Sequence, residues 1–423
     1  MLLPYLTQSK IKANLIWLCR MNLKALILLG CFFSSVSWAK TPLVLLSIDG
    51  FAQRYIAQYQ PKNLMSLMQQ GTSAKALLPI YPSKTFPNHL SIITGRYPIN
   101  HGIVHNTFYH RDIDKDYKLG DGKNDARWLT AKPLWHINEM QGNKSAVYFW
   151  PESETAIDNK TASYYYPYKH STPNKKRLEQ ILAWLRLPES ERPNFIAGYF
   201  ASVDDAGHKF GENSPQLIDA ISKLDALLGD FVQQINQEFK GKVNVVIVSD
   251  HGMTKVNKHH VIKWQENIIE GVKAINGSTQ LYLYSDNEIK LQQSVQLFNH
   301  AQANAQTENK QAQYRVYQYI DFPAHWHLNR KTAVVPNVII EALPSYVFSQ
   351  GKANITAETH GYDPKSSQEL EAIFIATGPA FSKNKQIAAF ENIHVLPIIT
   401  RALGLKDVDN IDGSYQVAEH IVE

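Results

Sequence analysis

Aspartate and histidine residues stand just after or before several apolar runs of this 423-residue chain, each close to a glycine. Six of them have side chains of the types that can bind divalent metals: Asp49, Asp204, His208, Asp250, His251 and His360. An aspartate directly after a strand is ordinarily a turn or helix-cap residue. The pair Asp204 and His208 is more suggestive, because residues four apart meet on one face of a helix.

Together, the six side chains predict a specific chemistry. Three carboxylates and three imidazoles divide into two mixed sites, and ligands of this kind suit zinc. A pair of such sites about 4 Å apart suits phosphoryl transfer. In open α/β sheets, functional groups gather at the carboxyl ends of the strands, where we expect these residues to lie.

A threonine in the stretch SKTFPN, just before the apolar run LSIIT, is the candidate nucleophile. Thr85 could simply cap a helix. A threonine hydroxyl is a poor nucleophile at neutral pH, but a metal lowers its pKa and the N-terminus of a helix favours its ionised form. Asn106 has a side-chain amide that donates hydrogen bonds, so it could hold a non-bridging phosphate oxygen.

Apolar, β-branched runs predict the strands that position these residues. They lie at 42–48, 144–150, 194–200, 243–249, 280–284, 337–343 and 371–377. Continuous apolar runs suit strands that are buried on both faces. Helical patterns alternate with them, and the clearest spans 215–238 after a Ser214-Pro215 cap. We therefore expect an α/β fold, with a mostly parallel central sheet covered by helices on both faces.

The chain is expected to have one catalytic domain, residues 40–423. The region 265–350 is richer in Gln and Asn and less regularly patterned. It is interpreted as a small subdomain inserted before the chain returns to the main sheet.

Residues 1–39 are expected to form a signal peptide, so the mature protein would be periplasmic or secreted. From Met21, a short basic start leads into an apolar run and a small-residue site that ends at Ala39. Met21 is an alternative start to Met1. A lipid anchor at Cys31 is a less favoured alternative. The apolar run of the leader is short for a membrane span of about 20 residues, and no membrane span is expected in the mature chain.

Removal of this leader would also change the composition of the mature chain. The leader contains both cysteines, Cys19 and Cys31, so the mature chain is expected to have neither a disulfide nor a thiolate metal ligand. It carries four of the 43 basic residues and none of the 38 acidic ones, which leaves a net charge of +1. Such a balance gives no indication of a nucleic-acid-coating surface.

The ordered set of motifs resembles the nucleotide pyrophosphatase/phosphodiesterase family of the alkaline phosphatase superfamily. The motifs are LLSIDGF, PSKTFPNH, HGIVHN, FWPESE, the D-x-x-G-H of Asp204 to His208, SDHGM and THGYD. The resemblance extends from about residue 42 to the end of the chain. It implies an alkaline phosphatase-like fold and a metal-dependent hydrolase acting on nucleotide-type phosphodiester or pyrophosphate bonds.

The resemblance also implies roles for the candidate residues. One zinc ion would be held by Asp204, His208 and His360. The other would be held by Asp49, Asp250 and His251, with Thr85 at its open position. Thr85 would attack phosphorus and form a phospho-threonine intermediate, and Asn106 would orient the phosphate.

Aromatic residues are expected to bind the substrate. By resemblance, Phe86 and Tyr199 would line the pocket, and Tyr168 is favoured over its neighbours Tyr164 to Tyr166. Ordinary core packing is the alternative for all of them. The segments 107–130 and 151–175 are expected to form part of the pocket wall.

Other functions are weighed against this one. The same metal core could serve lipid or choline diesters, or a phosphomonoesterase of the same superfamily. A sulfatase would need Cys or Ser in a C/S-x-P-x-R motif, where this chain reads TFPNH. A binding protein without activity would be expected to lack the nucleophile or a metal ligand. Here Thr85 and all six candidate ligands are present. The oligomeric state is not predicted.

Overall fold

The computed structural model describes residues 41–307, 312–349 and 355–423. The predicted signal peptide at 1–39, including Cys31 and the expected cleavage site after Ala39, lies outside the described residues. Residues 41–423 form one compact unit.

An eight-stranded sheet forms the centre of the described unit, with the order β19-β2-β18-β9-β1-β8-β6-β7. The strands are β1 Leu43–Ile48, β2 Thr72–Ala74, β6 Ser145–Tyr148, β7 Tyr164–Tyr166, β8 Phe195–Phe200, β9 Asn244–Val248, β18 Phe374–Thr377 and β19 Lys385–Ile387. Five of the seven neighbouring pairs are parallel, and β18 is antiparallel to both its neighbours. The expectation of a mostly parallel sheet is confirmed.

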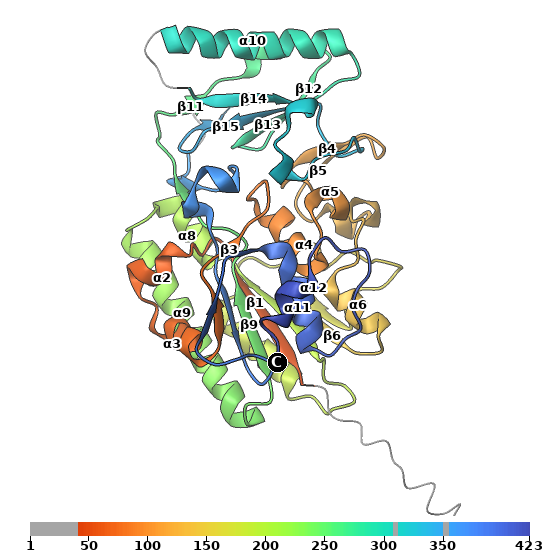
Figure 1. Ribbon diagram of the computed structural model, residues 1–423, viewed down its shortest axis with the longest axis vertical. Coiled ribbons are helices and arrows are strands. Elements are labelled where there is room, and N and C mark those ends of the chain that lie inside the picture. The colour runs from red at the N-terminus through yellow and green to blue at the C-terminus, as the bar shows by residue number, and fades with distance from the viewer. Residues whose placement is uncertain (1–40, 308–311, 350–354) are drawn as a thin grey trace, which may run out of the picture. The chain divides into compact units, whose positions relative to one another are not determined.

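Helices cover both faces of this sheet, because the side chains of β1 alternate between two apolar cores. Leu43 and Leu45 belong to one core and Val44, Leu46 and Ile48 to the other. The first core includes residues of α4 Thr85–Thr94, α5 Pro98–His101, α6 Leu134–Met140, α11 Val395–Ala402 and α12 Tyr415–Glu419. The second includes residues of α2 Arg54–Tyr59, α3 Lys62–Gln70, α7 Asn174–Leu185, α8 Ser202–Phe210 and α9 Pro215–Phe239. Figure 1 shows α2, α3 and α9 on one side of β1 and β9, with α4, α6 and α11 on the other.

The local sequence determines where helix α9 begins and which of its faces is buried. The side chain of Ser214 accepts a hydrogen bond from the Leu217 N–H at 3.2 Å, and Pro215 occupies the first turn, where its missing N–H costs nothing. The predicted apolar stripe, from Leu217 to Ile235, is buried against the sheet. The helix predicted over 215–238 is confirmed to within one residue.

Five of the seven apolar runs form strands of the central sheet, while three of its strands were not predicted. The missed strands are β2, β7 and β19. Each has only three residues, which is too short for an apolar or alternating pattern to stand out from the sequence.

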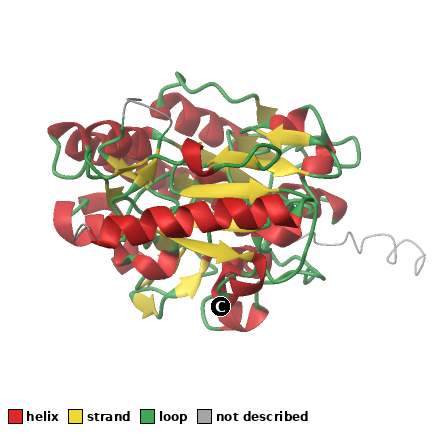
Figure 2. Cartoon of the chain, turned by 90° about the horizontal axis from the view of Figure 1, so that it is seen from above, coloured by secondary structure: helices red, strands yellow, loops and turns green. Residues whose placement is uncertain are grey.

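The other two runs form the middle of a second, antiparallel sheet with the order β12-β13-β15-β14. Its strands are β12 Lys273–Asn276, β13 Gln280–Tyr284, β14 Tyr314–Gln318 and β15 Val338–Ala342. Helix α10, Glu288–Thr307, packs on it through a shared apolar core, and Figures 1 and 2 show the helix lying over this sheet. This sheet falls within 265–350, the range expected for the inserted subdomain; the domain boundaries themselves stay a prediction.

Short strand pairs connect the remaining loops. They are β3 Leu77–Leu78 with β20 Phe390–Glu391, β4 Phe108–His110 with β5 Lys115–Tyr117, β10 Thr254–Lys255 with β17 Glu358–Thr359, and β11 Val261–Ile262 with β16 Val347–Phe348. Within the described ranges, no helix has both the length and the apolar character that membrane crossing requires.

Two isoleucines of α9 offer a matched test of this packing. Ile221 is 2% exposed and lies in the second core, between α9 and the central sheet, whereas Ile218 is 43% exposed on the same helix. Ile221→Ala is expected to lower the free energy of unfolding by about 2–5 kcal/mol, because it removes buried methylene groups and leaves a cavity. Ile218→Ala should change it by about 0.5 kcal/mol or less. Denaturant titration of the two variants measures both, and equal losses would contradict the assigned burial.

Candidate active site

The predicted metal ligands come together because three adjacent strands end beside one another. Strand β1 lies between β8 and β9 and is parallel to both. Asp49 follows β1, Asp250 follows β9, and Asp204 lies in α8, just after β8. Gly50 allows the close approach: it has φ +68°, and a Cβ there would lie 2.9 Å from the Asp204 Cβ.

One group of potential ligands consists of Asp49, Asp250 and His251, all buried. One ligand atom of each lies within 4.8 Å of the others. The His251 Nε2 is 2.9 Å from the Asp250 Oδ2 and 3.5 Å from the Asp49 Oδ1. The Thr85 Oγ1 lies 3.3 Å from the same nitrogen. The four residues that the resemblance assigned to one zinc ion are therefore neighbours.

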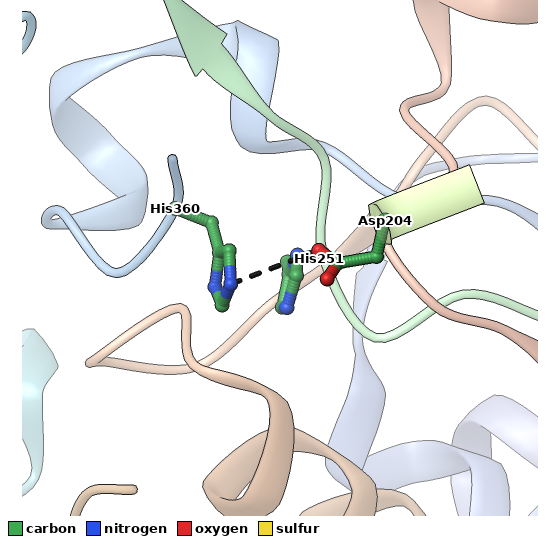
Figure 3. A group of neighbouring side chains, drawn as sticks. All are labelled: Asp204, His251 and His360. Carbon is green, nitrogen blue, oxygen red and sulfur yellow. Dashed lines mark ion pairs between the residues drawn. The ribbon is translucent and has the colours of Figure 1, made fainter. Parts of the chain in front are cut away.

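The second group consists of Asp204, His251 and His360, whose ligand atoms again lie within 4.8 Å of one another. Figure 3 shows these three side chains converging. The His360 Nε2 is 3.8 Å from one carboxylate oxygen of Asp204, and the His208 Nε2 is 3.4 Å from the other. His208 therefore contacts Asp204, as expected for its assigned site, although the tighter group contains His251 in its place. His251 belongs to both groups, and its ring stacks on that of His360 with ring centroids 3.6 Å apart.

The chemistry of these groups fits divalent cations. Two buried oxygens, the Oδ1 atoms of Asp49 and Asp204, have no hydrogen-bond partner among the described residues. The Oδ2 of Asp250 instead lies 2.9 Å from the His251 imidazole and 3.3 Å from the His89 imidazole. Burial raises the pKa of Asp49, and the nearby carboxylates of Asp250 and Asp204 raise it further. Carboxylates that lie this close together and are shielded from solvent repel one another unless a cation lies between them. Mixed Asp/His donors are a set that zinc accepts.

Thr85 is the first residue of α4, and its side chain does not cap the helix. The N-cap position is Lys84, and the Thr85 hydroxyl contacts His251 instead. The alternative that Thr85 is only a helix cap is therefore wrong. The helix dipole places partial positive charge at this end, which favours negative charge on the hydroxyl and on groups bound beside it.

Asn106 faces the same place from the loop after α5. Its Oδ1 accepts a hydrogen bond from the Phe86 backbone N–H at 3.0 Å. The polar group that remains on the amide is the NH₂, a donor. The side chain is thus oriented by the residue next to Thr85, and it offers an N–H to an anion in the site.

A cavity of about 430 Å³ opens onto both groups. All five predicted catalytic and substrate-binding residues line it: Thr85, Phe86, Asn106, Tyr168 and Tyr199. The segments expected to form its wall contribute as well, with Leu119, Gly120 and Lys123 from 107–130 and Pro151 to Glu154 from 151–175. The expectation that both segments form part of the pocket wall is confirmed.

The two tyrosines lie in different surroundings. Tyr199 is buried, and its hydroxyl donates a hydrogen bond to the Asp49 Oδ2, so it orients a potential ligand as well as lining the cavity. Tyr168 is 47% exposed and meets Phe149 edge to face, with ring centroids 5.2 Å apart. It forms an outer, solvent-facing part of the cavity wall.

Two buried residues outside the predicted ligand set support the site. The sequence alone favours a packing or supporting role for His89. This residue is fully buried, with its Nδ1 2.9 Å from the Thr85 carbonyl and 3.3 Å from the Asp250 Oδ2. Lys84 could have been solvated. Instead it is 5% exposed, donates a hydrogen bond to the His360 carbonyl at 2.8 Å, and has its pKa lowered to about 8 by burial.

Phe149 and Trp150 also line the cavity. The run 144–150 predicts them only as the end of a strand, but the backbone turns at Phe149, where φ is +70°. A turn of this kind has no signature in FWPESE, because positive φ is most readily expected at glycine or asparagine.

This fold is similar to solved structures of ectonucleotide pyrophosphatase/phosphodiesterase 5. The human protein matches with a TM-score of 0.82 and 26% identity, over 90% of this chain and 100% of that one. The murine protein matches with a TM-score of 0.82 and 25% identity, over 90% and 100%. The expected alkaline phosphatase-like α/β fold is thereby confirmed.

The sequence agrees with the fold. The family model for type I phosphodiesterase / nucleotide pyrophosphatase matches residues 43–363. A venom phosphodiesterase of Naja atra is 30% identical over 396 residues, 91% of this chain and 46% of that protein. Ectonucleotide pyrophosphatase/phosphodiesterase family member 3 of Mus musculus is 29% identical over 394 residues, 90% and 44% respectively.

The chain therefore belongs to the type I phosphodiesterase / nucleotide pyrophosphatase family. It spans about half the length of the curated relatives it matches.

The clustered carboxylates generate a prediction about metal. Zinc added to EDTA-treated protein is expected to raise the melting temperature, because a ligand that binds only the folded state stabilises it. The free energy of unfolding rises by about 2.7 kcal/mol when the ligand is at 100 times its Kd. Asp250→Asn should remove most of this zinc-dependent shift. Asp205→Asn is the control, since Asp205 follows Asp204 but lies outside both groups and pairs with His170 at 3.3 Å. An undiminished shift in Asp250→Asn would contradict the assignment.

Proposed function

We propose that this chain is a metal-dependent hydrolase that cleaves nucleotide-type phosphodiester or pyrophosphate bonds through a phospho-threonine intermediate. One observation carries the proposal: the Thr85 hydroxyl lies 3.3 Å from His251, the residue shared by the two ligand groups, on the wall of an aromatic-lined cavity. A nucleophile, a candidate pair of metal sites and a binding pocket thus meet at one point.

Two zinc ions are the proposed cofactors. Asp204, His208 and His360 would hold one of them, and Asp49, Asp250 and His251 the other, with Thr85 at its open position. When bound, the ions would act as Lewis acids that stabilise negative charge on the phosphoryl group and favour the ionised form of the threonine hydroxyl.

The remaining steps belong to the residues of the chain. The Thr85 oxygen attacks phosphorus, a bond forms between them, and the bond to the leaving alcohol or phosphate breaks. The amide N–H of Asn106 and the positive end of α4 stabilise the charge that develops on the phosphoryl oxygens. Water then attacks the same phosphorus and releases the threonine hydroxyl together with the phosphorylated product.

Nucleotide-type substrates are proposed from the pocket and the relatives. Phe86, Tyr168 and Tyr199 are aromatic walls of a kind on which a planar base stacks. Relatives named phosphodiesterase and ectonucleotide pyrophosphatase/phosphodiesterase support the same class. Lipid or choline diesters, or phosphomonoesters, are the alternatives.

The location and the domain division are also proposals. The relatives include a venom phosphodiesterase and an ectonucleotide pyrophosphatase/phosphodiesterase, which supports a secreted or periplasmic protein. The basic start, apolar run and small residues that end at Ala39 support a signal peptide at 1–39 that is cleaved after Ala39. Residues 40–423 would be the catalytic domain, with 265–350 as its inserted subdomain, and the partner would be a small-molecule substrate.

A paired hydrolysis assay tests the proposed reaction. The protein, supplied with zinc, is given the p-nitrophenyl ester of thymidine 5′-monophosphate, a diester, or p-nitrophenyl phosphate, a monoester. The expected result is a preference for the diester of at least about tenfold in kcat/KM, abolished by EDTA, because the organic group gains binding energy in the cavity. A preference for the monoester would favour the phosphomonoesterase alternative. No turnover of either would point to the lipid or choline diesters.

The nucleophile has its own test. Thr85→Ala is expected to lower kcat by about 10³-fold or more, because it removes the attacking oxygen. Its zinc content, measured by mass spectrometry, should stay close to that of the unmodified protein. Thr94→Ala is the matched control at the other end of α4, where the hydroxyl donates a hydrogen bond to the Leu90 carbonyl at 2.6 Å. Near-normal turnover by Thr85→Ala would show that another group attacks phosphorus.

A further inference from the structure

Glu152 lies on the cavity wall in a backbone conformation that glutamate rarely adopts. Its φ is +59° and it is 5% exposed, in the connection that follows β6. A residue other than glycine in the left-handed region is disfavoured and persists where its surroundings hold it. The contacts of the Glu152 side chain are therefore expected to hold this backbone conformation.

The carboxylate of Glu152 joins two segments of the cavity wall. Its Oε1 accepts a hydrogen bond from the Tyr117 hydroxyl, and the Gly122 backbone N–H also donates to the carboxylate. Its Oε2 accepts a hydrogen bond from the Thr155 hydroxyl at 2.8 Å. Two donors thus come from residues 117–123 and one from residues 149–155, which we name the 117–123 segment and the 149–155 segment.

The fit between the two segments is close. A Cβ at Gly122 would lie 2.1 Å from the Glu152 Oε2, so only glycine allows this approach. Tyr117 is fully buried and stacks on Phe108 with ring centroids 4.9 Å apart, so its hydroxyl is held in place. Burial raises the pKa of Glu152, whereas the hydrogen bonds from Tyr117 and Thr155 favour its ionised form. Hydrogen bonds to an ionised carboxylate are the stronger kind.

Both joined segments line the cavity. Leu119, Gly120 and Lys123 come from the 117–123 segment, and the 149–155 segment contributes the wall around Trp150 and Glu154. Neither segment contains a residue of the two ligand groups. Their arrangement therefore concerns the part of a substrate that lies away from phosphorus.

We propose that Glu152 is a positioning residue that fixes the 117–123 segment against the 149–155 segment and so determines how tightly the cavity holds the organic group of the diester. The inference rests on the proposed function and deepens it. A wall that is already ordered loses less conformational entropy when a ligand binds, so the effect belongs in KM rather than in the chemical step.

Steady-state kinetics with two diesters tests this role. The p-nitrophenyl ester of thymidine 5′-monophosphate fills the cavity with its nucleoside, whereas methyl p-nitrophenyl phosphate presents only a methyl group. Glu152→Gln is expected to raise KM for the nucleoside diester about tenfold and to change kcat by less than about threefold. The kcat/KM for the methyl diester should fall much less.

Two further variants separate the carboxylate from the backbone turn. Glu152→Gly relieves the left-handed backbone but removes the carboxylate, and it should raise KM as Glu152→Gln does. Gly122→Ala keeps the carboxylate but forces the segments apart, and it should have the same effect. If Glu152→Gly kept the KM of the unmodified protein, the turn alone would matter and the proposal would be overturned.

Asp225→Asn provides a matched control for a lost buried carboxylate. Asp225 is 6% exposed and accepts hydrogen bonds from the Asn63 N–H, the Asn63 side chain and the Leu64 N–H at 2.8–3.1 Å. It joins α3 to α9, away from the cavity lining. This variant should lose stability but keep the ratio of kcat/KM between the two diesters.

Hydrogen exchange of the amides at 117–123 provides a readout that needs no turnover. Faster exchange in Glu152→Gln than in Asp225→Asn is expected, because the segment loses its anchor. Unchanged exchange, or an equal fall in kcat/KM for both diesters, would overturn the proposal. If the unmodified protein hydrolysed neither diester, the proposed function would fail, while the exchange experiment would still decide whether Glu152 holds the wall.

Discussion

Electrostatic repulsion among three closely placed carboxylates, two of them fully enclosed, is the constraint on which the rest of the structure depends. Asp49, Asp204 and Asp250 meet where β1, β8 and β9 end, and the Oδ1 atoms of Asp49 and Asp204 are buried without a hydrogen-bond partner among the described residues. Like charges interact strongly at short range in surroundings of low dielectric constant. The three carboxylates can be held close together only by a rigid scaffold. The central sheet, which is packed by apolar cores on both faces, provides that scaffold.

The fold and the place where the candidate ligands gather could be predicted from the sequence, because both depend on local signals. Long apolar runs marked five of the central strands, and the residue types just after them marked the site. The two short edge strands, β7 and β19, gave no such signal, and their position follows from pairing with distant strands. The close association of His251 with Asp204 and His360 was likewise not predictable, since it depends on how helix α8 packs against two separate loops.

The cavity wall was the least predictable part of the site. Its outline depends on positive φ at Phe149 and Glu152 and on contacts between residues about 30 positions apart, such as Gly122 and Glu152. Periodicity and propensity describe neighbours along the chain, and they do not report such contacts. The segments could be assigned to the pocket, but the side chain that joins them could not be identified.

The surroundings of α4 have a consequence for how this protein changes through evolution. Every residue from Pro87 to Thr94 is buried, so the helix that carries Thr85 has almost no surface on which substitutions are cheap. Most inherited changes there would cost stability before they altered chemistry. The cavity wall, in contrast, is built from loops with partly exposed side chains such as Leu119 and Tyr168. Drift in these loops can alter which organic group is accepted while the reacting centre is inherited intact, so substrate range and chemistry are separable traits in this architecture.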